Sequence, residues 1–242
     1  MQSKRIGASN ASWLLRTISG PHGGAAAGPF GGHATLGDAI AYYRMEEATG
    51  NFARVDIVGG KNLTAEVPGA DPMQGTGKND FGTYGSDSWT VNPRNVTTAP
   101  HPHAPGPAKS RTYSLWAIAT TGDIFFEPVA TYVGAVGFGM AKLYNTISGS
   151  VSAIDGGFPS SGVWAHILVS VNHVAKTVSL RTNGGAPTTS SALSGTIATA
   201  TDFWRFILNQ GDAGVDEFGI WDRVLTSTEG DDLYNAGAGL FY

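Results

Sequence analysis

The stretch VDEFGIWDRVLTSTE, residues 215–229, decides the fold because it joins a strand pattern directly to a helix start. Phe218 and Ile220 alternate with other residue types, which is typical of a β-strand with one buried face. Thr226 followed by Glu229 matches a capping box, in which each side chain bonds the other residue's backbone N–H. We therefore predict a closing strand that runs into a helix of about two turns, ended by the Asn-Ala-Gly of residues 235–237.

The same stretch contains two adjacent acids, Asp216 and Glu217, which raises the question of catalysis. Neighbouring side chains of an extended strand point to opposite faces, so we expect Asp216 to share the face of Phe218 and Ile220. Glu217 would then point the other way, together with Trp221. Carboxylates on opposite faces cannot flank one glycosidic bond about 5–10 Å apart. We predict that the protein has no enzymatic activity.

The rest of the chain has the composition and patterning of an all-β protein. Of its 242 residues, 14% are charged and 34 are Gly, which suits short strands joined by tight turns. Segments with strand-like alternation occur at residues 39–46, 111–120, 164–173, 176–185 and 203–211. Residues 176–185 contain an Asn-Gly pair that predicts a hairpin turn. Many short strands separated by turn residues indicate a β-sandwich or barrel.

Charge and residue usage exclude several classes of function. The net charge of −4 argues against a nucleic-acid partner, because proteins that bind nucleic acids present a basic face. The sequence has no Cys, which excludes disulfides and thiolate metal sites. No stretch approaches the roughly 20 apolar residues that cross a membrane. The apolar run at Trp13, Leu14 and Leu15 is too short for a signal peptide, so we expect none.

Residues 1–35 differ in composition from residues 36–242. Within them GPHGGAAAGPFGGHA, residues 20–34, is mostly Gly, Ala and Pro, and buries too little apolar surface to order by itself. We predict an N-terminal anchoring arm, residues 1–35, that orders on a neighbouring subunit, followed by one domain, residues 36–242. The expected contact residues of the arm are Trp13, Leu14, Leu15 and Phe30.

Four segments, taken in order, resemble laminin G-like domains of the concanavalin A-like jelly-roll class. They are AYYRMEEATGNFARVDIVGGKNLT (residues 41–64), YSLWAIA (113–119), VWAHILVSVNHVAKTVSLRTNGG (163–185) and GVDEFGIWDRVLTSTEGDDLYNAG (214–237). The resemblance covers roughly residues 36–237. It implies an antiparallel jelly-roll β-sandwich, here with an extended N-terminal arm and one short C-terminal helix. This fold hosts lectins, adhesins, glycanases and virion proteins, so it does not fix a function.

The ending LYNAGAGLFY, residues 233–242, resembles the C-termini of such domains in bacteriophage structural proteins. With the arm, it predicts a non-enzymatic structural component of a phage particle, such as a capsid decoration or tail-associated protein. Such a protein would be made in the host cytoplasm, form a homo-oligomer and contact neighbouring virion subunits. The alternative is a carbohydrate-binding or adhesion module that recognises host-surface glycans, and a third hypothesis is a glycanase.

Two sets of residues are candidates for ligand binding. NDFGTYGSDSW, residues 79–89, combines amide, carboxylate and aromatic groups, and predicts sugar contacts at Tyr84, Asp87 and Trp89. The alternative is that these residues pack within the sandwich or against neighbouring subunits. The resemblance also implies a structural Ca²⁺ near the closing strand, held by Asp216 with Glu47 or Asp56. The alternative for Asp216 is that its carboxylate accepts hydrogen bonds from backbone N–H groups of the adjoining turn. We expect that the protein requires no cofactor.

Overall fold

The structure is a computed structural model that describes the chain from Ala34 to Leu240 with internal gaps. The described residues are 34–48, 53–60, 62–65, 73–84, 88–91, 110–118, 123–129, 135–137, 140–144, 151–155, 162–192, 194, 203–209 and 214–240. The four predicted contact residues of the arm lie outside this part of the chain, as does Asp87. Among the described residues, no helix is long and apolar enough to span a membrane.

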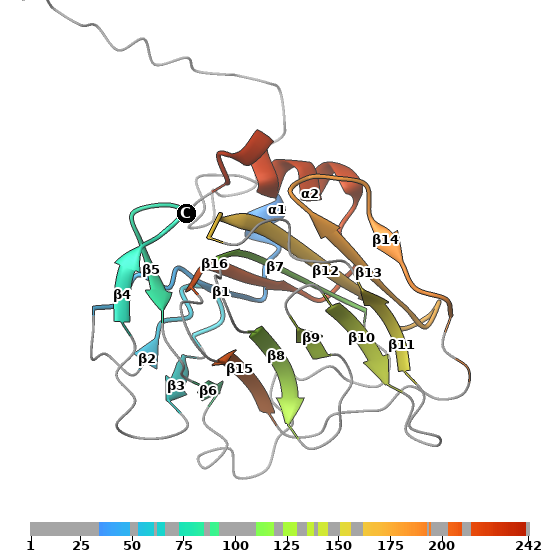
Figure 1. Cartoon of the computed structure of the whole chain (residues 1–242), viewed down its shortest axis with the longest axis horizontal. Helices are drawn as coiled ribbons and strands as arrows, with labels where there is room; N and C mark the ends of the chain where they lie inside the picture. Colours follow the sequence, from blue (N-terminus) through green and yellow to red (C-terminus); the bar gives the residue numbers. More distant parts are fainter. Residues whose placement is uncertain are drawn as a thin grey trace, which may run out of the picture.

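The described strands form two antiparallel sheets, packed as the two layers of a sandwich (Figure 1). In spatial order, the first sheet contains β14 (Thr188–Thr189), β13 (Thr177–Thr182), β12 (Ala165–Asn172), β7 (Arg111–Ile118), β16 (Gly214–Trp221), β5 (Phe81–Tyr84) and β4 (Met73–Thr76), with β1 (Ala41–Tyr43) also paired to β16. The second contains β11 (Val151–Asp155), β10 (Met140–Tyr144), β9 (Ala135–Gly137), β8 (Asp123–Val129), β15 (Phe203–Asn209), β6 (Ser88–Val91), β3 (Leu63–Ala65) and β2 (Ala53–Arg54). The predicted antiparallel β-sandwich is confirmed.

Side-chain alternation gives the first sheet two different buried faces. Directly paired residues of an antiparallel sheet point to the same face, and β12 pairs with β7 through Val169↔Tyr113 and His166↔Trp116. Tyr113 and Val169 therefore belong to the inner face, which looks toward the second sheet. Trp116 and His166 belong to the opposite, outer face. The predicted alternation of both strands is confirmed.

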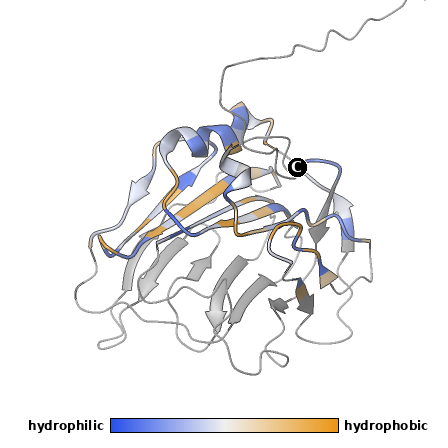
Figure 2. Cartoon of the chain, turned by 180° about the vertical axis from the view of Figure 1, so that it is seen from behind, coloured by the Kyte–Doolittle hydropathy of each residue, from blue (hydrophilic) through white to orange (hydrophobic). Residues whose placement is uncertain are grey.

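The outer face is covered by the C-terminal segment and a short N-terminal helix. Helix α1 (Ala34–Gly37) and helix α2 (Ser227–Tyr234), with the 3-10 turn at Asn235–Gly237, lie over this face (Figure 1). Figure 2 shows hydrophobic residues along the strands below and hydrophilic residues on the covering helix. A buried cluster lies between the outer face of the first sheet and the helices that cover it: Ala39, Tyr42, Leu168, Trp221, Leu225 and Leu233. Trp221 also donates its indole N–H to the Thr35 carbonyl at 2.7 Å, so the last residues of the predicted arm contact the sandwich.

Helix α2 begins and ends as the sequence predicts. Thr226 accepts the Glu229 N–H at 3.3 Å, while the Glu229 carboxylate accepts the Thr226 N–H at 2.8 Å. These two bonds are the predicted capping box. The helix ends where Asn235 adopts the left-handed conformation, with a φ of 46°. Leu225 and Leu233 are both buried, and they join the helical segment to the cluster on the outer face.

Candidate functional site

The acid pair lies on a β-bulge of β16. Asp216 pairs with Trp116 of β7, but the next pair is Gly219 with Ser114, so β16 advances three residues while β7 advances two. Glu217 is at the extra position of the bulge, and its backbone has a positive φ of 52°. The bulge reverses the alternation, and the predicted orientation of Asp216 is therefore wrong. Asp216 lies on the outer face with Trp116, opposite to Phe218 and Ile220.

The position of Phe218 supports this correction. Phe218 pairs with Tyr43 of β1, and their rings stack on the inner face with centroids 5.8 Å apart. Trp221, in contrast, pairs with Thr112 and shares the outer face with Asp216. Strict alternation fails here because the extra residue is a property of the pairing between β16 and β7, which the sequence of β16 alone does not specify.

Both acids of the bulge are buried, with exposed fractions of 0% for Asp216 and 3% for Glu217. Burial raises the pKa of Asp216 to about 7, although the backbone N–H groups of Asn79 and Lys78 oppose the shift. Burial likewise raises the pKa of Glu217 to about 8, opposed by the nearby Tyr42 hydroxyl and assisted by the charge of Asp216. Neither carboxyl is accessible to a substrate. The pair therefore forms no catalytic site in this structure.

The three acids expected to hold calcium are engaged separately. Asp216 accepts the N–H of Asn79, in the β4–β5 turn, at 2.9 Å, which is the alternative that the sequence left open. Glu47 accepts the N–H of Val55 at 2.7 Å. Asp56 accepts three backbone N–H groups, from Tyr42 at 3.0 Å, Val58 at 3.1 Å and Gly59 at 2.9 Å. The described residues contain no group of three or more Asp, Glu or His side chains that could hold a metal ion.

The residues predicted to contact sugar lie on both sheets. Tyr84 is in β5 of the first sheet, where it pairs with Gly214. Trp89 is in β6 of the second sheet, where it pairs with Phe206. Their role in sugar binding stays a prediction, as does that of Asp87.

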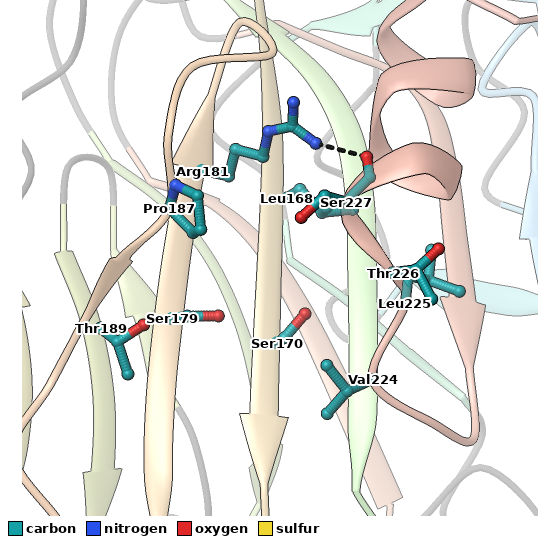
Figure 3. Close-up of a pocket in the computed structure, with 10 residues that line it drawn as sticks. All are labelled: Leu168, Ser170, Ser179, Arg181, Pro187, Thr189, Val224, Leu225, Thr226 and Ser227. Atoms are coloured by element: carbon teal, nitrogen blue, oxygen red, sulfur yellow. Dashed lines mark hydrogen bonds between the residues drawn. The ribbon is translucent and has the colours of Figure 1, made fainter.

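An open pocket of about 140 Å³ lies on the outer face of the first sheet (Figure 3). Strands β12, β13 and β14 form one wall and the segment that leads into α2 forms the other. The hydroxyl residues of the lining are Ser170, Ser179, Thr189, Thr226 and Ser227, and the apolar ones are Leu168, Pro187, Val224 and Leu225. Arg181 completes the lining, which contains no Asp, Glu or His.

The hydroxyl groups of the strand wall form a row across the sheet. The strand register pairs Thr112 with Ser170, Ser170 with Ser179, and Ser179 with Thr189. Because directly paired residues share a face, all four hydroxyls lie on the outer face at one level of the sheet. No single strand predicts this row, because it is visible only once the register of four strands is known. The signal that could have found it is the polar residue that interrupts the apolar pattern in each strand.

The hydrogen bonds of this row determine what it presents to the pocket. Thr112 donates its one hydroxyl proton to the Arg223 carbonyl at 2.8 Å and accepts the Leu225 N–H at 3.0 Å. Ser170, 3.0 Å from the Thr112 oxygen, must therefore be the donor in the bond between them. Its own oxygen remains available as an acceptor. The hydroxyls of Ser179 and Thr189 make no hydrogen bond to a described residue, so each can donate and accept.

Arg181 fixes the upper end of the pocket through bonds to both walls. Its Nε donates to the Gly185 carbonyl at 2.6 Å, and Nη2 donates to the Gly184 carbonyl at 2.7 Å and to the Asp231 carboxylate. Nη1 donates to the Ser227 carbonyl at 2.8 Å, and Figure 3 shows the guanidinium turned toward this atom. The side chain thus ties the β13–β14 turn to the start of α2. It holds the pocket walls in place, and most of its donors are already occupied.

The fold is shared with binding domains of a botulinum neurotoxin and of a mosquitocidal protein. No sequence family and no curated protein matches the chain. Solved structures do match. The binding domain of botulinum neurotoxin serotype D has a TM-score of 0.60 and 13% identity over 84% of this chain. The binding domain of Paraclostridial mosquitocidal protein 1 has a TM-score of 0.62 and 16% identity, again over 84%.

A further structure is the serotype D domain in complex with N-acetylneuraminic acid, with a TM-score of 0.59 and 14% identity over 83% of this chain. This chain spans about half of each of the three, namely 53%, 53% and 51% of their lengths. At these identities the similarity establishes the β-sandwich fold alone.

Proposed function

We propose that this chain is a non-enzymatic carbohydrate-binding module. The fold supports the proposal, because structures that share it include the serotype D domain with bound N-acetylneuraminic acid and a botulinum neurotoxin DC binding domain in complex with SialylT. The part that resembles this chain makes up about half of each of those domains, 51% and 52% of their lengths. Fold similarity alone does not transfer a ligand, so a property of this chain must carry the proposal.

The observation that carries it is the open pocket with its row of hydroxyls. Sugar hydroxyls both donate and accept hydrogen bonds, and the row offers them two groups that do the same, at Ser179 and Thr189, and one acceptor, at Ser170. Polar groups at a concave surface with apolar flanks are the usual make-up of a ligand site. The pocket therefore has the chemistry that recognition of an alcohol-rich ligand requires.

The same pocket argues against hydrolysis of the sugar. Glycoside hydrolysis uses two carboxyl groups that flank the scissile bond. The lining of this pocket has no carboxyl group, and the acid pair of β16 is buried elsewhere on the sheet. Binding without bond cleavage is the activity that these residues support.

The role in a phage particle stays a prediction from the sequence. The residues expected to anchor the chain to a virion lie outside the described part of the structure. The solved structures named above are binding domains, one of them with bound N-acetylneuraminic acid, and they support glycan recognition more than a capsid or tail role.

A glycan array probed with the purified full chain tests the proposal. We expect reproducible binding to at least one class of oligosaccharide. A Trp89→Ala variant, run in parallel, tests the sugar contact predicted from residues 79–89 and should bind as the natural chain does if the outer-face pocket is the site. Absence of binding to every glycan, by a chain shown to be folded, would refute the carbohydrate-binding function.

A further inference from the structure

We infer that the pocket between β12–β14 and the start of α2 is a subsite for a single uncharged sugar unit. The inference rests on the proposed carbohydrate-binding function and adds to it the class of ligand and the number of sugar units that the pocket holds. Size, polar groups, apolar groups and charge each restrict the ligand, and all four lead to the same class.

The size of the pocket limits what it can enclose. Its volume of about 140 Å³ is well below the roughly 300–1,000 Å³ typical of pockets that enclose drug-sized ligands. It is larger than the space that one or two ordered waters need. The rim residues Pro187, Thr189 and Thr226 are exposed, so the pocket opens to solvent. One ring of an oligosaccharide fits such a site, with the remaining units extending outward.

Each wall of the pocket offers groups that a sugar ring can contact. Ser170, Ser179 and Thr189 line the strand wall, where they can bond the hydroxyls at one edge of a ring (Figure 3). Val224 lies on the other wall, and 38% of this residue is exposed. It offers an apolar surface for the C–H groups of a pyranose, while Pro187 adds a second apolar group at the rim.

The charges near the pocket are already paired, which disfavours an acidic sugar. Four of the five N–H donors of Arg181 are used, in bonds to three carbonyls and to Asp231. Arg223, next to Val224, pairs with Glu229 and with Asp38. A carboxylate or sulfate placed here would lose its hydration without gaining an unpaired cation among the described residues of the lining. An uncharged unit has no such penalty.

The test compares pocket variants on neutral and sialylated forms of the same oligosaccharides, using the full chain and calorimetric titration. The Ser179→Ala/Thr189→Val double variant removes two hydroxyls that make no hydrogen bond to a described residue, so it should fold normally. Thr188→Val is the matched control, because Thr188 is its exposed neighbour in β14 but does not line the pocket. We expect the double variant to bind the neutral sugar about tenfold more weakly, and the control to bind it as the natural chain does.

Each outcome of this test bears on the proposals separately. Binding of neutral sugar that the double variant leaves unchanged overturns the pocket as the site, while the carbohydrate-binding function stands. Binding of sialylated forms alone overturns the assignment of an uncharged ligand. Binding of no sugar at all refutes the proposed function and this inference with it. Equal melting temperatures of the variants and the natural chain ensure that weakened binding reflects the lost hydroxyls.

Discussion

At the scale of single residues, the acid pair of β16 is the most unusual feature of the described structure. Two adjacent carboxyl groups are buried at a bulge, and the groups that influence their ionisation are Tyr42, Arg44, Glu46 and the backbone of the β4–β5 turn. Burial of an ionised acid is unfavourable unless it is paired, and such groups respond by holding their protons. The pair is thus a source of pH-dependent stability, and no catalytic role is required to explain its raised pKa values.

We predict that the free energy of unfolding falls as the pH rises from about 4 to about 8. The pKa of Asp216 is raised to about 7 and that of Glu217 to about 8, so the folded chain binds these protons more tightly than the unfolded chain does. The stabilisation from this source is complete below the pKa values that the two acids have in the unfolded chain, near 4. It is lost as the pH rises through the pKa values that they have in the folded chain. Urea unfolding at a series of pH values measures the slope.

The Glu217→Gln variant should remove much of that slope, because an amide of the same shape does not ionise. We expect it to be more stable than the natural chain by about 1–3 kcal/mol at pH 9 and to differ little at pH 4. Asp38→Asn is the control, since Asp38 is an exposed partner of Arg223, far in sequence from the bulge. An unchanged slope in Glu217→Gln would show that Glu217 is ionised in the folded chain and that the burial argument is wrong.

Gly219, which follows the bulge, is required by close packing on the outer face. A Cβ atom at this position would lie 2.5 Å from the Trp221 ring and 3.0 Å from Tyr42. Both rings belong to the buried cluster below the helices, so they have little room to move. We predict that Gly219→Ala lowers the free energy of unfolding by about 1–3 kcal/mol in urea.

Gly37→Ala is the matched control for this substitution. A Cβ atom at Gly37, in helix α1, would meet nothing within 4 Å. This variant should be as stable as the natural chain or slightly more stable, because Ala favours a helix. Equal stability of the two variants would contradict the packing explanation for Gly219.

At the scale of elements, helix α2 shows which parts of the fold are encoded locally. Its capping box, its left-handed stop at Asn235 and the Asn-Gly turn after β13 each depend on residues a few positions apart. All three follow from the sequence. The bulge at Glu217 and the bonds of Arg181 to α2 depend instead on how distant segments pair. Rules that consider one strand at a time cannot find them, which is why the sequence placed Asp216 on the wrong face.

The capping box gives a prediction for α2 as a unit. Thr226→Ala removes the side chain that accepts the Glu229 N–H, and should lower the free energy of unfolding by about 1 kcal/mol. Thr226→Ser keeps a hydroxyl at the same position and should restore most of the loss. Arg223 holds the pKa of Glu229 at about 2, so Glu229 stays charged in both variants at neutral pH. A serine variant as unstable as the alanine variant would show that the methyl group, and not the cap, matters.

At the scale of the whole molecule, the sandwich and its short C-terminal helix follow from the sequence patterns, whereas the candidate site does not. The sequence predicts sugar contacts in residues 79–89, because aromatic, amide and acidic residues occur together in that one segment. The hydroxyl row is assembled from four strands between Thr112 and Thr189, and no single segment reveals it. A binding surface that depends on the register of several strands can be identified only after the fold is known.

Backbone amide chemical shifts, recorded during titration with a neutral oligosaccharide, test most directly whether the outer-face pocket binds sugar. We expect saturable shifts at Ser170, Ser179, Thr189 and Val224, which line the pocket, with little change in β5 and β6. Shifts confined to the region of Tyr84 and Trp89, or the absence of shifts with every neutral sugar, would contradict this expectation.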